Sequence, residues 1–94
     1  MHVVVRRYVG ASKLIDVTLE RQSDVREVIS SVPGFRAYYG VRAGDGGMLT
    51  VTVCDDEAGT SESSRRAAEW VRNNVPGMTI DPPEIIAGET YLNF

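Results

Sequence analysis

The chain shows two kinds of hydrophobic pattern, one typical of strands and one typical of helices. Residues 2–9 form a short, valine-rich run that predicts a strand, and Gly10 ends it. After a possible N-cap at Ser12, apolar residues recur about every 3.6 residues, which predicts a helical segment that Pro33-Gly34 ends. Its apolar stripe comprises Leu14, Val17, Val25, Val28, Ile29 and Val32. Leu19 falls off this stripe and Ser23-Asp24 could begin a new helix, so the pattern leaves open one helix or two shorter ones.

Two further runs alternate strictly between two faces. The glycine-rich sequence Gly44-Asp45-Gly46-Gly47 separates them and is typical of a tight hairpin. In the first run one face carries Phe35, Ala37, Tyr39 and Val41, and the other carries Arg36, Tyr38, Gly40 and Arg42. In the second run one face carries Leu49, Val51 and Val53, and the other carries Met48, Thr50, Thr52 and Cys54.

The remaining residues predict a second helix and a last strand. Residues 55–59 are expected to be a polar loop, after which Thr60 or Ser61 can cap a helix that Pro76-Gly77 ends. Its narrow stripe comprises Ser64, Ala67, Ala68, Val71 and Val75. The last strand is expected from Glu84 to about Leu92. Residues 1–94 therefore predict one α+β domain with a ferredoxin-like βαββαβ order, in which two helices cover one face of a four-stranded antiparallel sheet.

The alternation also predicts which side chains face away from the helices. We expect the helices to cover the face with Phe35, Tyr39, Leu49, Val51 and Val53. The bare face would then carry Val4, Arg6, Tyr8, Arg36, Tyr38, Met48, Thr50 and Thr52, a mixture that we expect a second copy or a ligand to cover. The first strand leaves its own orientation open, since either its Val3 and Val5 face or its Val4, Arg6 and Tyr8 face could meet the helices. Coordinates with Tyr38 under a helix and Tyr39 pointing away would overturn this assignment.

Composition narrows the class of protein. The chain is 43% hydrophobic and 24% charged, which is typical of globular proteins, and its net charge of -3 argues against a nucleic-acid partner. Cys54 is the single cysteine, so neither an intrachain disulfide nor a cysteine-based zinc site is possible. Arg6 and Arg7 interrupt the first apolar run after three valines, which fits neither a signal peptide nor a membrane span. We therefore expect a soluble, cytoplasmic protein without a membrane partner.

Three stretches carry a resemblance to a known family: VPGFRAYYGVRAGDGGMLTVTVCDD, GTSESSRRAAEWVRNN and PPEIIAGETYL. With the element order across nearly all 94 residues, the chain resembles the dimeric α+β barrel proteins, and among them the antibiotic-biosynthesis-monooxygenase-like domains. The entry into the second strand at Pro33–Phe35 and the stretch Ala67–Val71 are especially similar. The resemblance implies a homodimer whose two sheets face each other, with a pocket between sheet and helices in each protomer.

The resemblance also implies two activities to compare with the residues. The cofactor-free monooxygenases oxidise polycyclic aromatic substrates in a pocket with an Asn, a Trp and tyrosines. Trp70 could match that Trp, and Tyr38 or Tyr39 a pocket tyrosine, but the first strand offers Arg6 rather than Asn. The haem-degrading relatives hold haem through a histidine on the second helix. The second helix predicted here contains no histidine, so we expect neither haem degradation nor any cofactor.

The candidate ligand-binding residues are Arg6, Tyr8, Arg36, Tyr38, Thr50 and Trp70. A tyrosine phenol could donate to a carbonyl, and the two arginines could bind a carboxylate or phenolate, or instead pair with Glu89 or a second copy. Trp70 could stack on an aromatic ligand, or it could seal the edge of the core.

We do not expect His2, next to Met1, to be held in the fixed orientation that a general base needs. No base partner is suggested for Cys54, and the acidic residues 55–57 are typical of a solvated loop. Three functions remain open: a small-ligand binding protein, a cofactor-free monooxygenase of an aromatic substrate, and a structural or interaction domain. A cavity of about 300 Å³ or more beside Tyr38 and Trp70 would favour the first two over the third.

Overall fold

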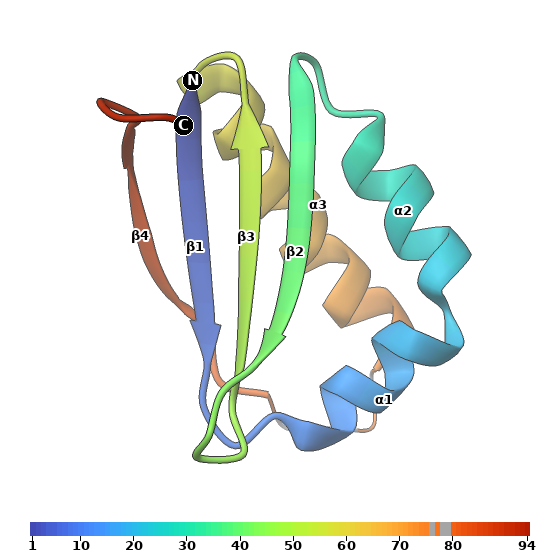
Figure 1. The fold of residues 1–94 in the computed structure, drawn as a ribbon. Helices are drawn as coiled ribbons and strands as arrows, with labels where there is room; N and C mark the ends of the chain where they lie inside the picture. Colours follow the sequence, from blue (N-terminus) through green and yellow to red (C-terminus); the bar gives the residue numbers. More distant parts are fainter. Residues whose placement is uncertain (76, 78–79) are drawn as a thin grey trace.

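Figure 1 shows the computed structural model, which describes residues 1–75, 77 and 80–94. In chain order its elements are β1 (His2–Tyr8), α1 (Ser12–Glu20), α2 (Gln22–Ser30), β2 (Phe35–Arg42), β3 (Met48–Cys54), α3 (Glu57–Asn74) and β4 (Glu84–Glu89). The strands form one antiparallel sheet in the order β2-β3-β1-β4, and the helices lie on one side of it. This arrangement confirms the predicted ferredoxin-like α+β fold.

The structure settles where the helices begin and end. The first helical segment consists of two helices, because the chain leaves the helical conformation at Arg21, whose φ is -113°. The second predicted helix begins at Glu57, earlier than expected, since the Asp56 carboxylate accepts a hydrogen bond of 3.2 Å from the Gly59 N–H and so caps α3. The prediction of a polar loop was therefore wrong for residues 57–59. The helix stop predicted at Pro76 lies outside the described residues.

The predicted assignment of the two sheet faces was wrong except at Phe35, which faces the helices as predicted. The buried residues of β1 and β3 are Val4, Arg6, Tyr8, Met48, Thr50, Thr52 and Cys54. Tyr38 points into the space between the sheet and α2, whereas Tyr39 is 59% exposed. The orientation that the first strand left open is thereby settled, with Val4, Arg6 and Tyr8 towards the helices.

A β-bulge explains part of this reversal. Phe35 pairs with Cys54, but Ala37 pairs with the next residue along β3, Val53, so Arg36 is the extra residue of the bulge. Because of this extra residue, Phe35 and Tyr38 face the same side, against the strict alternation expected from the sequence.

The rest of the explanation lies in α3, which packs closely against β3 through small residues. A Cβ atom added at Gly59 would lie 2.6 Å from the Pro33 carbonyl oxygen and 2.8 Å from the Cys54 Cβ. Thr60 and Ser63 are also buried on this side of α3. These small and hydroxyl-bearing residues can satisfy the polar groups of the sheet face they cover, so the more polar face of the sheet becomes the covered one.

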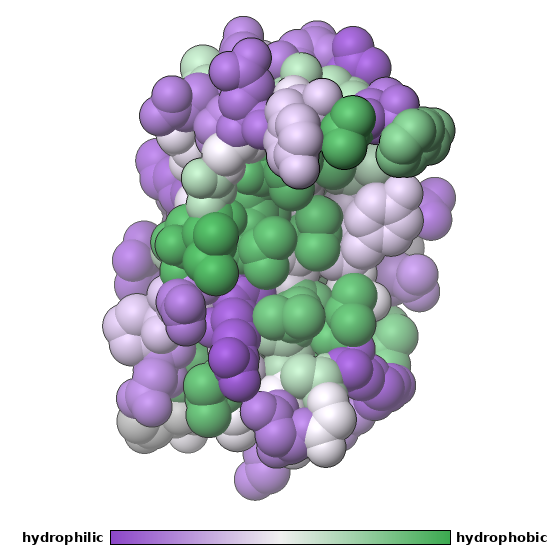
Figure 2. Space-filling model, turned by 60° about the vertical axis from the view of Figure 1, so that its left-hand side comes forward, coloured by the Kyte–Doolittle hydropathy of each residue, from purple (hydrophilic) through white to green (hydrophobic). Residues whose placement is uncertain are grey.

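The opposite face of the sheet, which we call the open face, is mainly apolar, with Arg7 and Glu84 side by side near one end. Its central cross-strand row runs from Tyr39 through Val51 and Val5 to Ile86. Tyr39 and Ile86 are both more than half exposed. Val3, Val41, Leu49 and Val53 lie on the same face in the neighbouring rows. Figure 2 shows apolar side chains gathered in the middle of this side of the molecule, with hydrophilic ones around them.

The buried core fills the helix-covered side near the end of β1. It comprises Tyr8, Ala11, Leu14, Met48 and Val75, with Ile15, Val17, Trp70, Val71 and Ile80 packed around them. Over the described part of the chain, none of the helices combines the length and the apolar character needed to span a bilayer.

Candidate functional site

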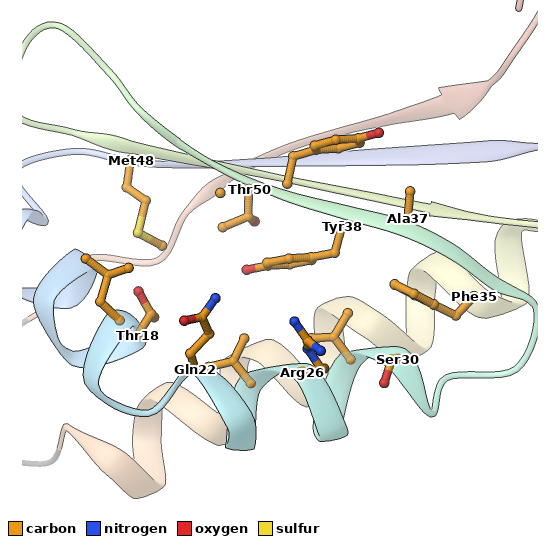
Figure 3. Close-up of a pocket in the computed structure, with 14 residues that line it drawn as sticks. Thr18, Gln22, Arg26, Ser30, Phe35, Ala37, Tyr38, Met48 and Thr50 are labelled. Carbon is orange, nitrogen blue, oxygen red and sulfur yellow. The ribbon is translucent and has the colours of Figure 1, made fainter.

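A cavity of about 670 Å³ lies between β2 and β3 on one side and α1 and α2 on the other. Phe35, Val25, Ile29 and Met48 give it apolar walls. Its polar side chains come from both sides: Tyr38 and Thr50 from the sheet, and Thr18, Gln22 and Arg26 from the helices. Figure 3 shows Gln22 and Arg26 rising from α2 towards the Tyr38 ring. No aspartate or glutamate is among the described residues that line this outer cavity.

A smaller cavity of about 30 Å³ adjoins the outer one. The residues that line both are Thr18, Val25, Ile29, Tyr38, Met48 and Thr50. Arg6, Tyr8, Ala67 and Trp70 line the inner cavity but not the outer one, so the inner cavity reaches from the Tyr38 side chain to α3. Its volume is close to the share of one water molecule in liquid water, about 30 Å³. A ligand in the outer cavity could therefore extend a single small group into the inner one.

Arg6 is buried beside the inner cavity, with 1% of its surface exposed. On the sheet side, its Nε donates to the Thr50 hydroxyl at 3.1 Å and its Nη2 to the Thr52 hydroxyl at 2.6 Å. On the α3 side, its Nη1 donates to the hydroxyls of Ser63 at 3.2 Å and Ser64 at 3.0 Å. All four acceptors are neutral, so these bonds orient the guanidinium group without cancelling its charge.

Burial governs the ionisation of the groups around Arg6. Desolvation raises the pKa of both the Tyr8 and the Tyr38 phenols, and the Arg6 charge opposes that rise. Desolvation also lowers the pKa of the Arg6 guanidinium below its ordinary value. The titratable groups that act on Arg6 are Tyr8, Tyr38 and Cys54, all of them neutral when protonated. At neutral pH the site therefore holds a positive charge among neutral hydrogen-bonding groups.

The structure brings five of the six predicted site residues together. Arg6, Tyr8, Tyr38, Thr50 and Trp70 all line the inner cavity, under the helices rather than on the bare face where four of them were expected. Arg36 lies elsewhere, because it forms an ion pair with Asp55 in which both side chains are more than half exposed. Neither Arg6 nor Arg36 is paired with Glu89, the acidic partner that the sequence offered.

The predicted site residues include none from the helix side of the outer cavity. Gln22, Arg26 and Ser30 of α2 are spaced by four residues, so they form a polar line beside the apolar stripe of that helix, and Thr18 of α1 also lines the cavity. That spacing was the available signal. The serines of α3 that bind Arg6 were missed as well: Ser64 was interpreted as part of a stripe that packs on the sheet, and Ser63 was given no binding role.

Two arginines form hydrogen bonds between α3 and the helical wall of the outer cavity. Arg66 donates through Nη1 to the Val28 carbonyl at 3.0 Å and to the Ser31 hydroxyl at 2.8 Å, at the end of α2. Arg21, at the break between α1 and α2, donates through Nη1 to the Asn74 side-chain oxygen at 2.7 Å. Hydrogen bonds thus connect both ends of α2 to α3.

In the described part of the chain, neither the single histidine nor a cluster of acidic residues forms a second candidate site. A ring nitrogen of His2 lies 2.6 Å from the Thr60 hydroxyl, and His2 lines neither of the two cavities. Within residues 1–75, 77 and 80–94, no three His, Cys, Asp or Glu side chains are grouped so that they could hold a metal ion.

Comparisons with known proteins found similarity in structure only. No family model and no curated protein sequence matches the chain. A monooxygenase from the gene ActVA-Orf6 of Streptomyces coelicolor, solved with nanaomycin D, is 19% identical with a TM-score of 0.68, over 99% of this chain and 89% of that one. The haem degrader MhuD from Mycobacterium tuberculosis, solved with two haems bound, is 13% identical with a TM-score of 0.68, over 100% and 99%.

A dimeric ferredoxin-like protein from an uncultured marine organism is 8% identical with a TM-score of 0.69, over 99% of this chain and 95% of that one. At such identities the likeness concerns the fold, while activity depends on individual site residues. This chain has the ferredoxin-like α+β fold of the antibiotic-biosynthesis-monooxygenase-like proteins that its sequence resembles.

Proposed function

We propose that this protein binds a small aromatic or polyketide-like ligand in the outer cavity, as a homodimer associated through its open face. The observation that supports ligand binding is the outer cavity itself. Its volume of about 670 Å³ falls within the range of about 300–1,000 Å³ that is usual for small-molecule sites. Apolar walls with a few converging polar groups are also typical of such sites, and the rings of Phe35 and Tyr38 suit an aromatic ligand.

Haem is a poor fit for this site. The histidine that holds haem in the haem-degrading relatives would have to come from α3, and residues 57–74 contain none. The ligand class that the lining residues suit is a planar organic molecule without a metal.

Ligand binding can be measured through the single tryptophan, Trp70, which lines the inner cavity. We expect hydroxylated naphthoquinones and anthrones to quench its fluorescence saturably. Gln22→Phe should fill part of the outer cavity and weaken binding at least about tenfold, corresponding to about 1.4 kcal/mol. Ser23→Phe, one residue along the same helix and outside the lining, is the matched control. Equal weakening by both variants, or no quenching by any compound, would contradict the proposal.

Oxygen uptake distinguishes a binding protein from an oxygenase. A cofactor-free monooxygenase needs a substrate that itself supplies electrons to oxygen, so anthrones and quinols are suitable substrates. Uptake above the rate without protein, abolished by Gln22→Phe, would extend the function to catalysis. Uptake at background with saturable binding would leave a binding protein.

The homodimer is supported by the open face. Val5, Val51 and Ile86 form an apolar row across its centre, and a contiguous apolar surface of this kind is usually an interface. We expect light scattering at micromolar concentration to give the mass of a dimer, and Val51→Glu to give a folded monomer. Val9→Glu is the control, since Val9 is 70% exposed just beyond the end of β1. A monomeric wild-type protein would overturn the dimer. The cytoplasmic location stays a prediction from the sequence.

A further inference from the structure

The charge of the two cavities is opposite in sign to that of the whole chain. The protein carries a net charge of -3, yet no described residue that lines either cavity is acidic. The two charged side chains among them are both arginines: Arg6 at the inner cavity and Arg26 on the wall formed by α2. An excess of positive charge confined to one cavity favours a negatively charged ligand.

Arg6 is a stronger reason than Arg26 to expect a negatively charged ligand, because its charge is buried without a carboxylate partner. Its four hydrogen bonds go to threonine and serine hydroxyls, and no acidic side chain is among the groups that act on its ionisation. A buried charge that lacks an opposite charge is strongly unfavourable. The opposite charge is therefore expected from outside the chain, and the inner cavity is where it can approach.

We propose that the ligand binds as an anion, a carboxylate, phenolate or enolate, with a charged oxygen in the inner cavity beside Arg6. This inference rests on the proposed function and specifies the chemical class of the ligand. The rings of the ligand lie in the outer cavity, and the charged oxygen reaches the inner cavity beside Tyr38 and Thr50, which line both cavities.

The bonds of Arg6 leave one donor for such an oxygen. A guanidinium group has five N–H donors, and the four bonds to Thr50, Thr52, Ser63 and Ser64 use four of them, which leaves one N–H on Nη2. The inner cavity has room for about one water-sized group, at 30 Å³. A phenolate or carboxylate oxygen fits that space, whereas a tetrahedral phosphate or sulfonate group does not. The cavity size thus selects among anions.

A matched pair of compounds tests how the charge of the ligand affects its affinity. The first is 2-hydroxy-1,4-naphthoquinone, which is ionised at neutral pH, and the second is 2-methoxy-1,4-naphthoquinone, which is neutral and has the same rings. We expect the wild-type protein to bind the ionised compound at least about tenfold more tightly, measured by quenching of Trp70 fluorescence. Arg6→Met should abolish this preference, and Arg42→Gln, which removes an exposed arginine outside both cavities, should keep it. A second pair, 1-naphthoate and 1-naphthyl phosphate, tests the size limit, and we expect tighter binding of 1-naphthoate.

The outcomes separate the two proposals. Equal affinity of the wild-type protein for both quinones, with binding still weakened by Gln22→Phe, would contradict the proposal that the ligand binds as an anion. The proposed ligand site in the outer cavity would still stand. Binding of neither quinone and neither naphthalene compound would overturn both. The wild-type comparison needs no variant, so the inference stays testable even if Arg6→Met fails to fold. Tighter binding of the phosphate than of the carboxylate would overturn the placement of the oxygen in the inner cavity.

Discussion

Tyr38 and Tyr39 are consecutive residues of β2 whose side chains lie on opposite faces of the sheet. Tyr38 reaches into the outer cavity against α2, and Tyr39 is 59% exposed in the central row of the open face. One strand therefore contributes a phenol to the proposed ligand site and another to the proposed dimer interface.

This relationship predicts different effects of the same small change at the two positions. Tyr38→Phe removes a hydroxyl donor from the boundary between the cavities, so we expect the affinity for 2-hydroxy-1,4-naphthoquinone to fall about fivefold to tenfold, which is typical of one lost hydrogen bond. Tyr39 is also among the residues that line the outer cavity, but its side chain is on the open face, so Tyr39→Phe should leave that affinity unchanged. Fluorescence titration of both variants measures this, and equal affinities would show that the Tyr38 hydroxyl does not contact the ligand.

Arg6 gives a prediction about stability. Replacing Arg6 by an apolar side chain removes the cost of burying its charge, but it also leaves four hydroxyls without this donor. Because these two effects oppose each other, we expect Arg6→Met to leave the free energy of unfolding close to that of the wild type while it removes the preference for anions. Arg6→Ala, which leaves a hole in the same place, should lower that free energy by about 2–5 kcal/mol relative to Arg6→Met. Chemical denaturation measures both. A large loss of stability in Arg6→Met would instead indicate a structural role for the guanidinium group.

Gly59 predicts a reversal of the usual effect of alanine in a helix. Alanine normally stabilises a helix interior by about 1 kcal/mol over glycine. At Gly59, however, the added Cβ would collide with the Pro33 carbonyl and Cys54, so we expect Gly59→Ala to lower the free energy of unfolding by about 1–3 kcal/mol.

Gly44→Ala is the control for Gly59→Ala, because a Cβ added at Gly44 meets nothing within 4 Å. Its free energy of unfolding should stay within about 0.5 kcal/mol of the wild type. An unchanged or higher stability of Gly59→Ala would contradict the close approach of α3 to β3.

The buried phenols predict how stability changes in alkali. The pKa of Tyr8 and of Tyr38 is raised above the ordinary value of 10.0, so the folded state holds these protons more tightly than the unfolded state. Their contribution is fully present below about pH 10 and is lost as the pH rises through their folded pKa. We expect the free energy of unfolding to fall above about pH 10, and to fall less steeply in the double variant Tyr8→Phe with Tyr38→Phe. A fall of equal slope in both proteins would contradict the raised pKa values.

The sequence by itself determined the order and kind of the elements and much of the composition of the site. The valine-rich run, the alternation after Phe35 and the glycines before Met48 are local signals. Each of these three signals lies in the strand or hairpin turn that it predicted. Five of the six candidate site residues singled out in the sequence also line the inner cavity. Local periodicity carries this information because it depends on the residues of one element.

Only the tertiary structure decided which face of the sheet is covered. An alternating pattern defines two faces but does not say which one a helix will meet, and the extra residue at Arg36 shifts one strand against the other. The apolar face remained open, and the face with Arg6, Thr50 and Thr52 was covered, because Ser63 and Ser64 of α3 accept the hydrogen bonds that its guanidinium offers. That match between β1 and α3 joins residues more than fifty positions apart, so no local pattern could predict it.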